Sequence, residues 1–366
     1  MHCAISEVGK RLKVLHSGVE GVTTADHLPG QGAKRREAEG APSTPAHQLF
    51  IVCDRNVRAM VEMIGTEADG VFELDANEEN KTFGTVVEIE RWLMDSGADR
   101  NAILLGIGGG ITTDITGFTA SIYKRGIRFA FVPTTLLSQV DAAIGGKNGV
   151  NLDSFKNMIG VIRQPEAVFI CPEPLETLPY PQIVSGAAEL LKTFIIDNSK
   201  GLYDMAVETL SGIRRAGGNI TGYSEKLNDL IAEAALIKAG IAGRDPYEKG
   251  ERRLLNLGHT FAHAIEKLSR EKISHGEAVS VGMILAARLA GKVGIANKAL
   301  ESRLKADFKA CGMAIDCPFS VSEMTSAMAK DKKAEGSIIH YILPAEIGHV
   351  LVEDMTPAEA TRLLQE

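Results

Sequence analysis

Short runs of apolar residues alternate along the first half of the chain with segments whose apolar positions recur at helical spacing. The runs lie at 49–53, 102–105, 129–132 and 167–170. Continuous apolar runs of this length are typical of parallel strands buried on both faces. The segment from Thr85 to Ser96 has helical periodicity and predicts a covering helix. The first half is therefore expected to be a Rossmann-like α/β nucleotide-binding layer, in which ligands gather at the carboxyl ends of the strands.

The pattern changes after a proline-rich bridge at residues 172–181. Helical periodicity dominates from Ile183 to about Ala310, and a short hairpin is predicted from Ile338–Leu343 and Val350–Val352. We predict three parts, with the substrate at the seam between the two domains. These parts are a poorly defined, weakly ordered segment (1–47), a nucleotide-binding α/β domain (48–181) and a mainly helical metal- and substrate-binding domain (182–366).

Composition restricts the partners of the protein. With 366 residues, 45% of them hydrophobic and 24% charged, the chain can bury a large core and form two domains. The net charge of −7 and the pI near 5.8 argue against a nucleic acid or an anionic membrane as partner. The longest apolar run, Ala278 to Ala287, is too short to span a bilayer. Any anionic ligand must therefore be held by a local cluster of basic residues.

The cysteines indicate the cellular compartment. The chain has five of them, widely scattered and without a CxxC pair. This usage suits structural thiols in a reducing compartment better than a disulfide framework. The N-terminus lacks a continuous apolar stretch of the signal-peptide kind. The sequence therefore predicts a cytoplasmic protein.

Histidines are concentrated in the second half at spacings that a divalent metal can use. His259 and His263 are four residues apart, so that on a helix both rings project from one face, and His275 can fold back beside them. Thr260 replaces the glutamate that a zinc protease needs after its first histidine. The pattern favours a two- or three-histidine metal site other than a protease, against the alternative of packed or exposed helix residues.

Two glycine-rich segments follow the predicted strands. Gly106 to Asp114 comes directly after the second strand, where glycines let the backbone approach a pyrophosphate and a helix beginning near Asp114 aims its amides at that charge. Packing between strand and helix is an equal alternative. Further on, Thr134-Thr135, Asp141, Gly145-Gly146-Lys147 and Lys156-Asn157 predict a cradle for a phosphate or carboxylate, with a solvated basic loop as the alternative.

Several blocks together resemble the 3-dehydroquinate synthases of the sugar-phosphate cyclase superfamily. They follow the family order across roughly residues 50 to 350. The resemblance implies an N-terminal nucleotide-binding α/β domain, a C-terminal helical metal domain and, usually, a homodimer. The blocks are Gly108 to Phe118, Tyr123 to Leu137, Val140 to Gly160, Glu189 to Lys192, and Leu255 to Glu266.

The resemblance also assigns the cofactors. It implies Zn²⁺, with Co²⁺ as a substitute, bound by Glu189, His259 and His275, and it moves His263 from the metal to the substrate. Three protein ligands leave positions open for substrate oxygens. The second cofactor implied is NAD⁺, with Asp54 at the end of the first strand suited to a ribose hydroxyl. The NAD⁺ residues implied are Asp54, Glu78, Lys81, Gly109, Gly110, Asp114, Thr134, Thr135, Lys147, Lys156, Leu175 and Thr177; for Glu78 and Lys81 a solvated charged face is the alternative.

The substrate implied is a sugar phosphate, 3-deoxy-D-arabino-heptulosonate 7-phosphate, which carries a carboxylate and a phosphate. The family reaction oxidises it transiently with NAD⁺, eliminates phosphate, returns the hydride and closes the ring by an intramolecular aldol step. Lys192 and Lys238 interrupt apolar helix faces, as expected of long cations that reach toward an anion. The residues matching the family's substrate pocket are Arg125, Asp141, Lys147, Lys156, Asn157, Lys192, Lys238, Arg252, Asn256 and His263, with a further contact expected from Lys332-Lys333.

Three other functions are weighed against this one. A different sugar-phosphate cyclase or a metal-dependent polyol dehydrogenase would share the domain pair. The retention of Lys147, Arg252, Asn256 and His263 favours the heptulosonate enzyme, because relatives acting on substrates without a carboxylate change this pocket. A non-catalytic NAD-binding regulator would lack a metal ligand, and Glu189, His259 and His275 are all present.

Overall fold

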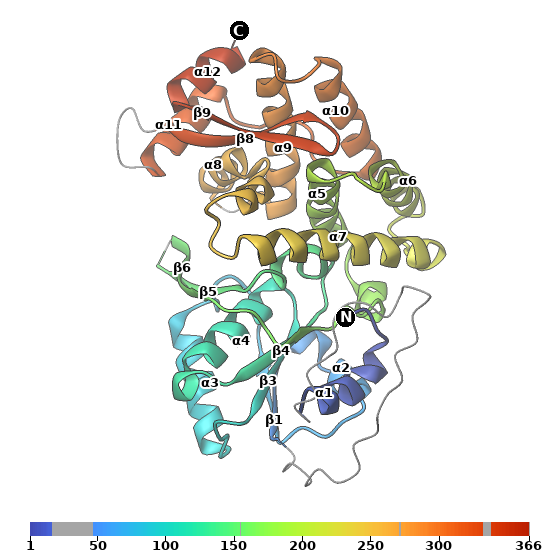
Figure 1. The fold of residues 1–366 in the computed structure, drawn as a ribbon, viewed down its shortest axis with the longest axis vertical. Helices are drawn as coiled ribbons and strands as arrows, with labels where there is room; N and C mark the ends of the chain where they lie inside the picture. Colours follow the sequence, from blue (N-terminus) through green and yellow to red (C-terminus); the bar gives the residue numbers. More distant parts are fainter. Residues whose placement is uncertain (17–46, 154, 271, 332–337, 366) are drawn as a thin grey trace. The chain divides into compact units, whose positions relative to one another are not determined.

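The computed structural model describes residues 1–16, 47–153, 155–270, 272–331 and 338–365. It divides into two compact units (Figure 1). The first comprises Met1–Pro133 and Asn148–Cys171, and the second comprises Thr134–Lys147 and Pro172–Glu366. The segment Thr134–Lys147, which the sequence places in the nucleotide-binding domain, thus groups with the second unit. The domain boundaries at 47/48 and 181/182 stay a prediction.

The first unit is built on a parallel sheet of strand order β2-β1-β3-β4-β7. The four apolar runs are confirmed as strands. Three of them fill rows buried on both faces, whereas the fourth is a strand only at Ala167–Val168, at an edge of the sheet. One strand was not predicted: β2 lies at the edge of the sheet and is only partly buried, so that its sequence lacks a continuous apolar run. The strands are β1 (Leu49–Asp54), β2 (Gly70–Leu74), β3 (Ile103–Gly108), β4 (Arg128–Pro133) and β7 (Ala167–Val168).

Helices cover both faces of this sheet. On one face lie α3 (Phe83–Asp95), which confirms the predicted covering helix, and α4 (Gly110–Ile122). Trp92 of α3 meets Phe50 of β1 edge to face, with ring centroids 5.6 Å apart. Helix α3 begins two residues before the predicted Thr85 because Thr82 caps it, accepting a hydrogen bond from the Thr85 amide.

The opposite face corrects the expectation of weak order at the N-terminus. Residues Ile5–Glu7 (η1) and Val8–His16 (α1) are helical, and α2 (Met60–Met63) lies in the same layer. Ile5, Val8 and Leu12 are buried against the sheet face that carries Ile51, Leu105 and Phe169 among others. A sheet of buried parallel strands needs a cover on each face, and this segment supplies it. The rest of the N-terminal segment, 17–46, lies outside the described residues.

The first unit also contains a small two-stranded sheet of β5 (Lys147–Leu152) and β6 (Phe155–Ile162). The sequence predicts only a glycine- and lysine-rich loop there. The difference arises because Lys156-Asn157 and the nearby glycines favour a loop, and because β6 is largely exposed although it contains the apolar Phe155, Met158 and Ile162. The short 3₁₀ helices elsewhere are η2 (Arg55–Val57), η3 (Tyr123–Arg125), η5 (Glu173–Thr177), η6 (Thr221–Tyr223) and η7 (Glu251–Asn256).

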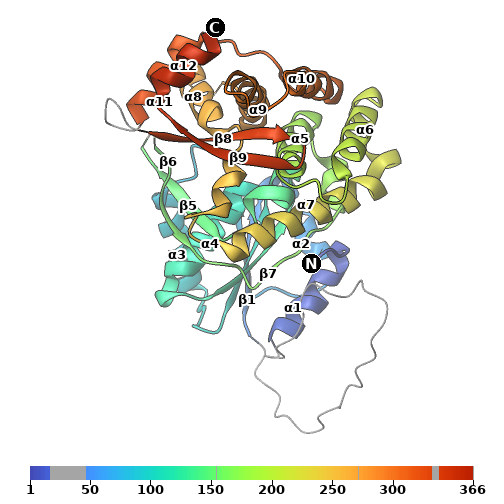
Figure 2. The same cartoon turned by 45° about the horizontal axis from the view of Figure 1, so that its top comes forward.

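The second unit is mainly helical, as predicted. A hairpin of β8 (Ile339–Glu346) and β9 (His349–Met355) packs against α9 and α5 (Figure 2). This hairpin confirms the predicted one and is longer. Helices α11 and α12 were not predicted. The helices are α5 (Tyr180–Ile196), α6 (Leu202–Arg215), α7 (Ser224–Arg244), α8 (His259–Ser269), α9 (His275–Lys292), α10 (Ala299–Cys311), α11 (Val321–Asp331) and α12 (Pro357–Gln365), with one π-helical turn, η4 (Ser138–Ala142).

Glycines allow an unusually close approach of α9 to its neighbours. A Cβ atom on Gly282 would lie 2.2 Å from the carbonyl oxygen of Gly258, and one on Gly276 would lie 2.3 Å from the Cα of Ser185 in α5. Gly258, the residue before α8, has φ +79°, which favours glycine. These contacts bring the first turns of α8 and α9 close to α5.

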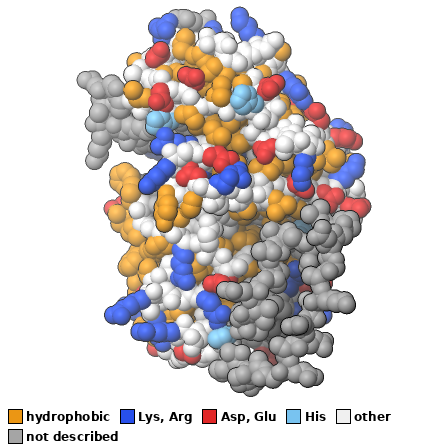
Figure 3. Space-filling view, in the orientation of Figure 1, with side chains coloured by type: hydrophobic (Ala, Val, Ile, Leu, Met, Phe, Trp, Pro, Cys, Tyr) orange, Lys and Arg blue, Asp and Glu red, His pale blue; other side chains and the backbone are white. Residues whose placement is uncertain are grey.

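The surface agrees with the composition. Figure 3 shows acidic and basic side chains interspersed over the visible face of the second unit, without a basic stripe. Among the described residues, none of the helices combines the length and the apolar character needed to cross a bilayer. All five cysteines are free thiols, and four of them are buried.

Replacing Gly282 by Ala tests the close approach of the helices. We expect a loss of roughly 1–3 kcal/mol in the free energy of unfolding, because the added methyl group meets backbone that cannot rotate away. Gly291→Ala in the same helix is the matched control, since nothing lies within 4 Å of its Cβ position; it should leave stability unchanged or raise it by up to about 1 kcal/mol. Urea denaturation followed by circular dichroism measures both. Equal effects would contradict the packing described.

Candidate active site

A buried carboxylate lies at the centre of the second unit. Glu189 is on α5, a helix whose residues from Gly186 to Ile196 are all buried, and its own exposure is 0%. Lys192 follows one helical turn later and is 1% exposed. The two side chains form an ion pair between Glu189 Oε2 and Lys192 Nζ. The apolar character of α5 thus places two charges where water cannot solvate them.

Two histidines meet this carboxylate from the first residues of two helices. The Nε2 atoms of His259, which opens α8, and His275, which opens α9, lie 3.6 and 3.2 Å from Glu189 Oε1. One ligand atom from each of the three residues lies within 4.8 Å of the others. Ser274 and Glu277 form a capping box that sets the start of α9.

The other ring nitrogens are also engaged. His259 Nδ1 lies 3.2 Å from the Leu257 carbonyl oxygen, and His275 Nδ1 lies 3.1 Å from Glu266 Oε1. Both partners accept hydrogen bonds, so each Nδ1 carries a proton. His275 Nε2 also lies within hydrogen-bond distance of an acceptor, Glu189 Oε1, and donates a second proton to it in a hydrogen bond. Ring nitrogens held in this way are typical of metal-ligating histidines. Glu189, His259 and His275 therefore form a group that could hold a divalent metal ion.

The pKa shifts agree with a site for a cation. Burial alone raises the pKa of Glu189, but Lys192, His275 and His259 outweigh it and hold that pKa well below its usual range. Burial and the nearby Lys192 ammonium lower the pKa of His259 to about 3, despite Glu189. For His275, hydrogen bonds to Glu189 and Glu266 outweigh burial and raise the pKa to about 10.

The histidine spacing alone predicts a different set of metal ligands. His263 was expected to share the face of His259, and its ring centroid does lie 5.7 Å from that of His259. The side chain of His263 is nevertheless exposed, one turn further along α8, and Glu189 takes the place it would fill. Nothing in the local sequence of α5 singles out Glu189 as a metal ligand; only the resemblance did.

A second cluster of buried charges continues from Lys192. Lys192 Nζ lies 3.7 Å from Asp141 Oδ1, and Lys238 Nζ lies 2.6 Å from the same oxygen. Lys238, from α7, also donates to the Asp141 carbonyl oxygen at 2.7 Å and is 7% exposed. Asp141 belongs to the π-helical turn η4, a conformation often found at functional sites.

The same contacts set the charge states of this cluster. Burial raises the pKa of Asp141, but Lys238 and Lys192 outweigh it and lower that pKa. Burial lowers the pKa of Lys192, but Glu189 and Asp141 raise it overall. The pKa of Lys238 is lowered, because Asp141 offsets only part of the effect of burial. The expectation that Lys192 and Lys238 reach toward anions is thus met by carboxylates of the protein itself.

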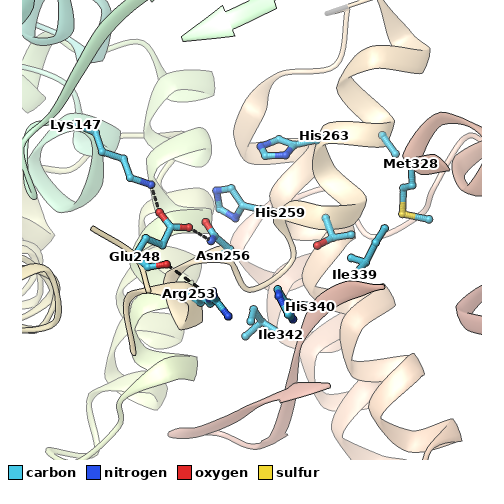
Figure 4. Close-up of a pocket in the computed structure, with 12 residues that line it drawn as sticks. Lys147, Glu248, Arg253, Asn256, His259, His263, Met328, Ile339, His340 and Ile342 are labelled. Atoms are coloured by element: carbon cyan, nitrogen blue, oxygen red, sulfur yellow. Dashed lines mark hydrogen bonds and ion pairs between the residues drawn. The ribbon is translucent and has the colours of Figure 1, made fainter. Parts of the chain in front are cut away.

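A pocket of about 430 Å³ opens beside His259 (Figure 4). This volume is within the range of small-molecule sites. Lys147 forms an ion pair with Glu248, which also accepts a hydrogen bond from the Asn256 side chain. His259 and His263 both face the pocket from α8 (Figure 4). The opposite wall is partly apolar, with Ile339, Ile342 and Met328.

The loop before α8 is shaped by Asp245. Its carboxylate accepts hydrogen bonds from the backbone amides of Lys249, Gly250 and Arg252, at 3.0, 2.7 and 3.1 Å. Arg252 is 3% exposed and donates to the Pro246 carbonyl oxygen at 2.8 Å. The loop therefore carries the predicted Arg252 and Asn256. It also carries Glu248 and Arg253, which the sequence analysis did not predict because they belong to no recognisable motif.

The predicted nucleotide residues of the first unit lie near the point where the strand order reverses, between β1 and β3. Asp54 ends β1 and caps the next turn, accepting from the Asn56 amide at 2.9 Å. Helix α4 begins at Gly110, earlier than the start predicted near Asp114, because Gly109 takes the N-cap position. Gly108 must lack a side chain, since a Cβ there would lie 2.4 Å from Thr112 Oγ1.

The contacts of Lys81 and Glu78 argue against the alternative that these residues form a solvated charged face. Lys81 is 6% exposed, and its Nζ lies 2.6 Å from both Asp114 Oδ2 and Asn157 Oδ1. Glu78 Oε1 accepts from Asn151 Nδ2 at 2.8 Å. The fold thus joins these two residues to the predicted Asp114 and Asn157 in one polar network of the first unit.

The remaining predicted residues are placed as follows. Arg125 and Lys156 are exposed side chains of the first unit. Thr134, Thr135, Leu175 and Thr177 belong to the second unit, where Thr134 and Leu175 are buried and Thr135 Oγ1 hydrogen-bonds Ser138. Lys332 and Lys333 lie outside the described residues.

Comparison with known proteins identifies the class. Two solved structures are similar to the chain at 26% identity. A 2-deoxy-scyllo-inosose synthase complexed with carbaglucose-6-phosphate, NAD⁺ and Co²⁺ has a TM-score of 0.75, with 87% of this chain and 90% of that chain covered. The 2-epi-5-epi-valiolone synthase of Streptomyces hygroscopicus, with NAD⁺ and Zn²⁺ bound, has a TM-score of 0.76, with 92% and 98% covered. The fold is that of the sugar-phosphate cyclase superfamily, to which the chain belongs.

Within that superfamily the sequence matches are more specific. The 3-dehydroquinate synthase N-terminal family model matches residues 71–185, and the C-terminal one matches residues 186–334. The 3-dehydroquinate synthase of Thermococcus kodakarensis is 42% identical over 289 residues, covering 79% of each chain. The chain belongs to the 3-dehydroquinate synthase family.

The buried charge cluster predicts a large effect of Lys238→Met. The change leaves Asp141 with only the longer contact to Lys192, and we expect a loss of about 3–5 kcal/mol in the free energy of unfolding. The control is Lys200→Met. Lys200 Nζ lies 2.6 Å from Glu233 Oε2, but the lysine side chain is 61% exposed, so the change should lower the free energy of unfolding by less than about 1 kcal/mol. Chemical denaturation of both variants measures the difference, and similar losses would contradict the account.

Proposed function

We propose that this protein converts 3-deoxy-D-arabino-heptulosonate 7-phosphate to 3-dehydroquinate and phosphate, using NAD⁺ and a divalent metal ion, Zn²⁺ or in its place Co²⁺. The observation that carries the proposal is the convergence of Glu189, His259 and His275 beside a pocket with basic and amide side chains. Membership of the family supports the same reaction.

The three converging residues fit a catalytic metal. One carboxylate and two imidazoles are a donor set that zinc accepts, and three protein ligands leave room for substrate oxygens. When bound, the metal supplies Lewis acidity to a hydroxyl or carbonyl oxygen of the substrate. Lys192 keeps Glu189 ionised, and the partners of the two Nδ1 atoms orient both Nε2 atoms toward it. His275 would release its Nε2 proton when the metal binds.

The dinucleotide is proposed to bind at the residues the resemblance assigned. Asp54 at the end of β1, Gly109 and Gly110 at the start of α4, and the Lys81–Asp114 pair in the first unit support this assignment, because parallel sheets bind nucleotides beyond their strand ends. NAD⁺ supplies reversible hydride transfer. The proposed set also includes Glu78, Lys156, Thr134, Thr135, Lys147, Leu175 and Thr177.

The substrate's two anionic groups need fixed cations in this acidic protein. Lys147 lines the pocket, while Lys238 and Arg252 are buried in the elements around it. Asn256 and His263 add groups that can exchange hydrogen bonds with hydroxyls, and Glu248 holds Lys147 and Asn256 in place. Arg125, Asp141, Asn157 and Lys192 complete the proposed substrate and catalytic set.

The overall reaction is redox-neutral. A carbon–oxygen bond to phosphate breaks, and a carbon–carbon bond closes the carbocycle. A metal-dependent polyol dehydrogenase would instead accumulate NADH, and another cyclase would require a different sugar phosphate. The retained pocket residues favour the heptulosonate. We further propose a cytoplasmic homodimer, which the free cysteines and the family support.

The test is phosphate release from the heptulosonate with NAD⁺ and Zn²⁺ present, coupled to a dehydratase whose product absorbs in the ultraviolet. Phosphate and chromophore should appear together, without accumulation of NADH. Release of neither, by protein that binds both cofactors, would favour a sister cyclase; steady NADH formation from a polyol would favour a dehydrogenase.

Removing a proposed metal ligand should abolish turnover while the fold survives. Glu189→Gln removes the anionic oxygen, and His275→Ala removes a ring nitrogen, so each should lose bound metal and at least about 100-fold in kcat/KM. The measurements are metal content, steady-state kinetics and circular dichroism. His349→Ala, an exposed position on β9, is the control and should keep both metal and activity. Full activity without bound metal in either ligand variant would refute the assignment.

A further inference from the structure

The two histidines of the proposed metal site differ in what holds their rings. His259 Nδ1 faces a backbone carbonyl oxygen two residues before it, a neutral acceptor that no side-chain change can remove. His275 Nδ1 lies 3.1 Å from the Glu266 carboxylate. His275 opens α9, whereas Glu266 belongs to α8. The ring of His275 is therefore oriented by a charged partner that belongs to neither the pocket lining nor the ligand set.

The position of Glu266 in α8 is unfavourable for a carboxylate, which argues that the residue has a specific role. It lies in the last turn of α8, where the helix dipole disfavours a negative charge. Its side chain is only 12% exposed, and its neighbours Ala264 and Ile265 are buried. A carboxylate in such a place costs free energy unless a donor or cation offsets it. The imidazole at the start of α9 provides that offset.

The contact is also not needed to hold α8 and α9 together. These helices already meet closely at Gly258 and Gly282, and α9 starts with its own capping box at Ser274 and Glu277. A single hydrogen bond that His275 donates to Glu266 adds little to that packing. Its specific effect falls on the orientation and proton position of one imidazole ring.

We propose that Glu266 is a positioning residue for the metal ion. It holds His275 in the tautomer with the proton on Nδ1, orients its Nε2 toward Glu189, and strengthens that nitrogen as a metal donor through the negative charge behind the ring. This inference rests on the proposed function, because it concerns the metal of that same site. It assigns no direct contact with substrate to Glu266.

Metal affinity tests the inference apart from activity. Apoprotein variants Glu266→Gln and Glu266→Ala are titrated with Zn²⁺ and Co²⁺ against a chromophoric chelator. Loss of an outer partner of this kind typically weakens metal binding roughly 10- to 100-fold, so Glu266→Ala should fall in that range. Glu266→Gln keeps an oxygen acceptor without the charge and should be intermediate. The visible absorption of bound Co²⁺ should shift in Glu266→Ala, because the orientation of one ligand changes.

The matched control is Glu301→Gln. Glu301 is likewise a partly buried carboxylate that links two helices, through a 2.9 Å contact to Arg288, but it contacts none of the proposed ligands. Its metal dissociation constant and Co²⁺ spectrum should equal those of the wild type. Urea unfolding of the metal-free proteins shows whether either Glu266 variant is merely less stable.

The outcomes separate the two ideas. Unchanged affinity and an unchanged Co²⁺ spectrum in Glu266→Ala would overturn the positioning role while leaving the proposed function intact. If Glu266→Ala does not fold, Glu266→Gln decides, and an affinity equal to that of the wild type overturns the inference. A wild-type protein that binds neither ion would overturn the metal-dependent function itself, and with it this inference.

Discussion

The second unit depends on keeping Glu189 ionised in the middle of a helical core. A buried charge costs several kcal/mol unless it is paired, and here the pairing extends through a series of groups of alternating sign. Lys192 offsets Glu189, Asp141 offsets Lys192, and Lys238 completes the series. Because each group leaves an uncompensated neighbour when removed, α5, α7 and η4 are bound to one arrangement around the carboxylate.

The same constraint explains the packing of α8 and α9. Both histidines must reach Glu189 from the first residue of a helix, so the two helix starts have to converge on α5. Gly258, Gly276 and Gly282 make that convergence possible by removing side chains where backbones meet. At these starts the unsatisfied amides favour a neutral imidazole over a cationic one. The helix starts thus favour the neutral form of each imidazole, whereas the Glu189 carboxylate favours the charged form.

Burial decides how much of this architecture the sequence predicts. The strands at the centre of the sheet can be predicted because both of their faces are apolar. The edge strand β2 lacks a continuous apolar run, and Lys156, Asn157 and Gly160 interrupt the apolar residues of the exposed β6. Histidine spacing points to the proposed metal site but pairs His259 with His263, whereas the fold brings Glu189, from a helix far earlier in the chain, together with His259 and His275. Lys81 looks like a surface charge until the fold brings Asp114 and Asn157 to it.

The site combines side chains that are held in place with side chains that are exposed, and the proposed reaction explains why both kinds are needed. His259, His275 and Glu189 are each held by contacts on more than one side, which suits the proposed binding of an ion that must stay in place through the reaction. His263 is exposed at the pocket, where an unburied side chain can follow a substrate whose charge and shape change. Lys147 is exposed there too but is paired with Glu248. A proposed ligand set built on buried, mutually dependent charges would therefore allow the side chains that face the substrate to move without loss of the ion.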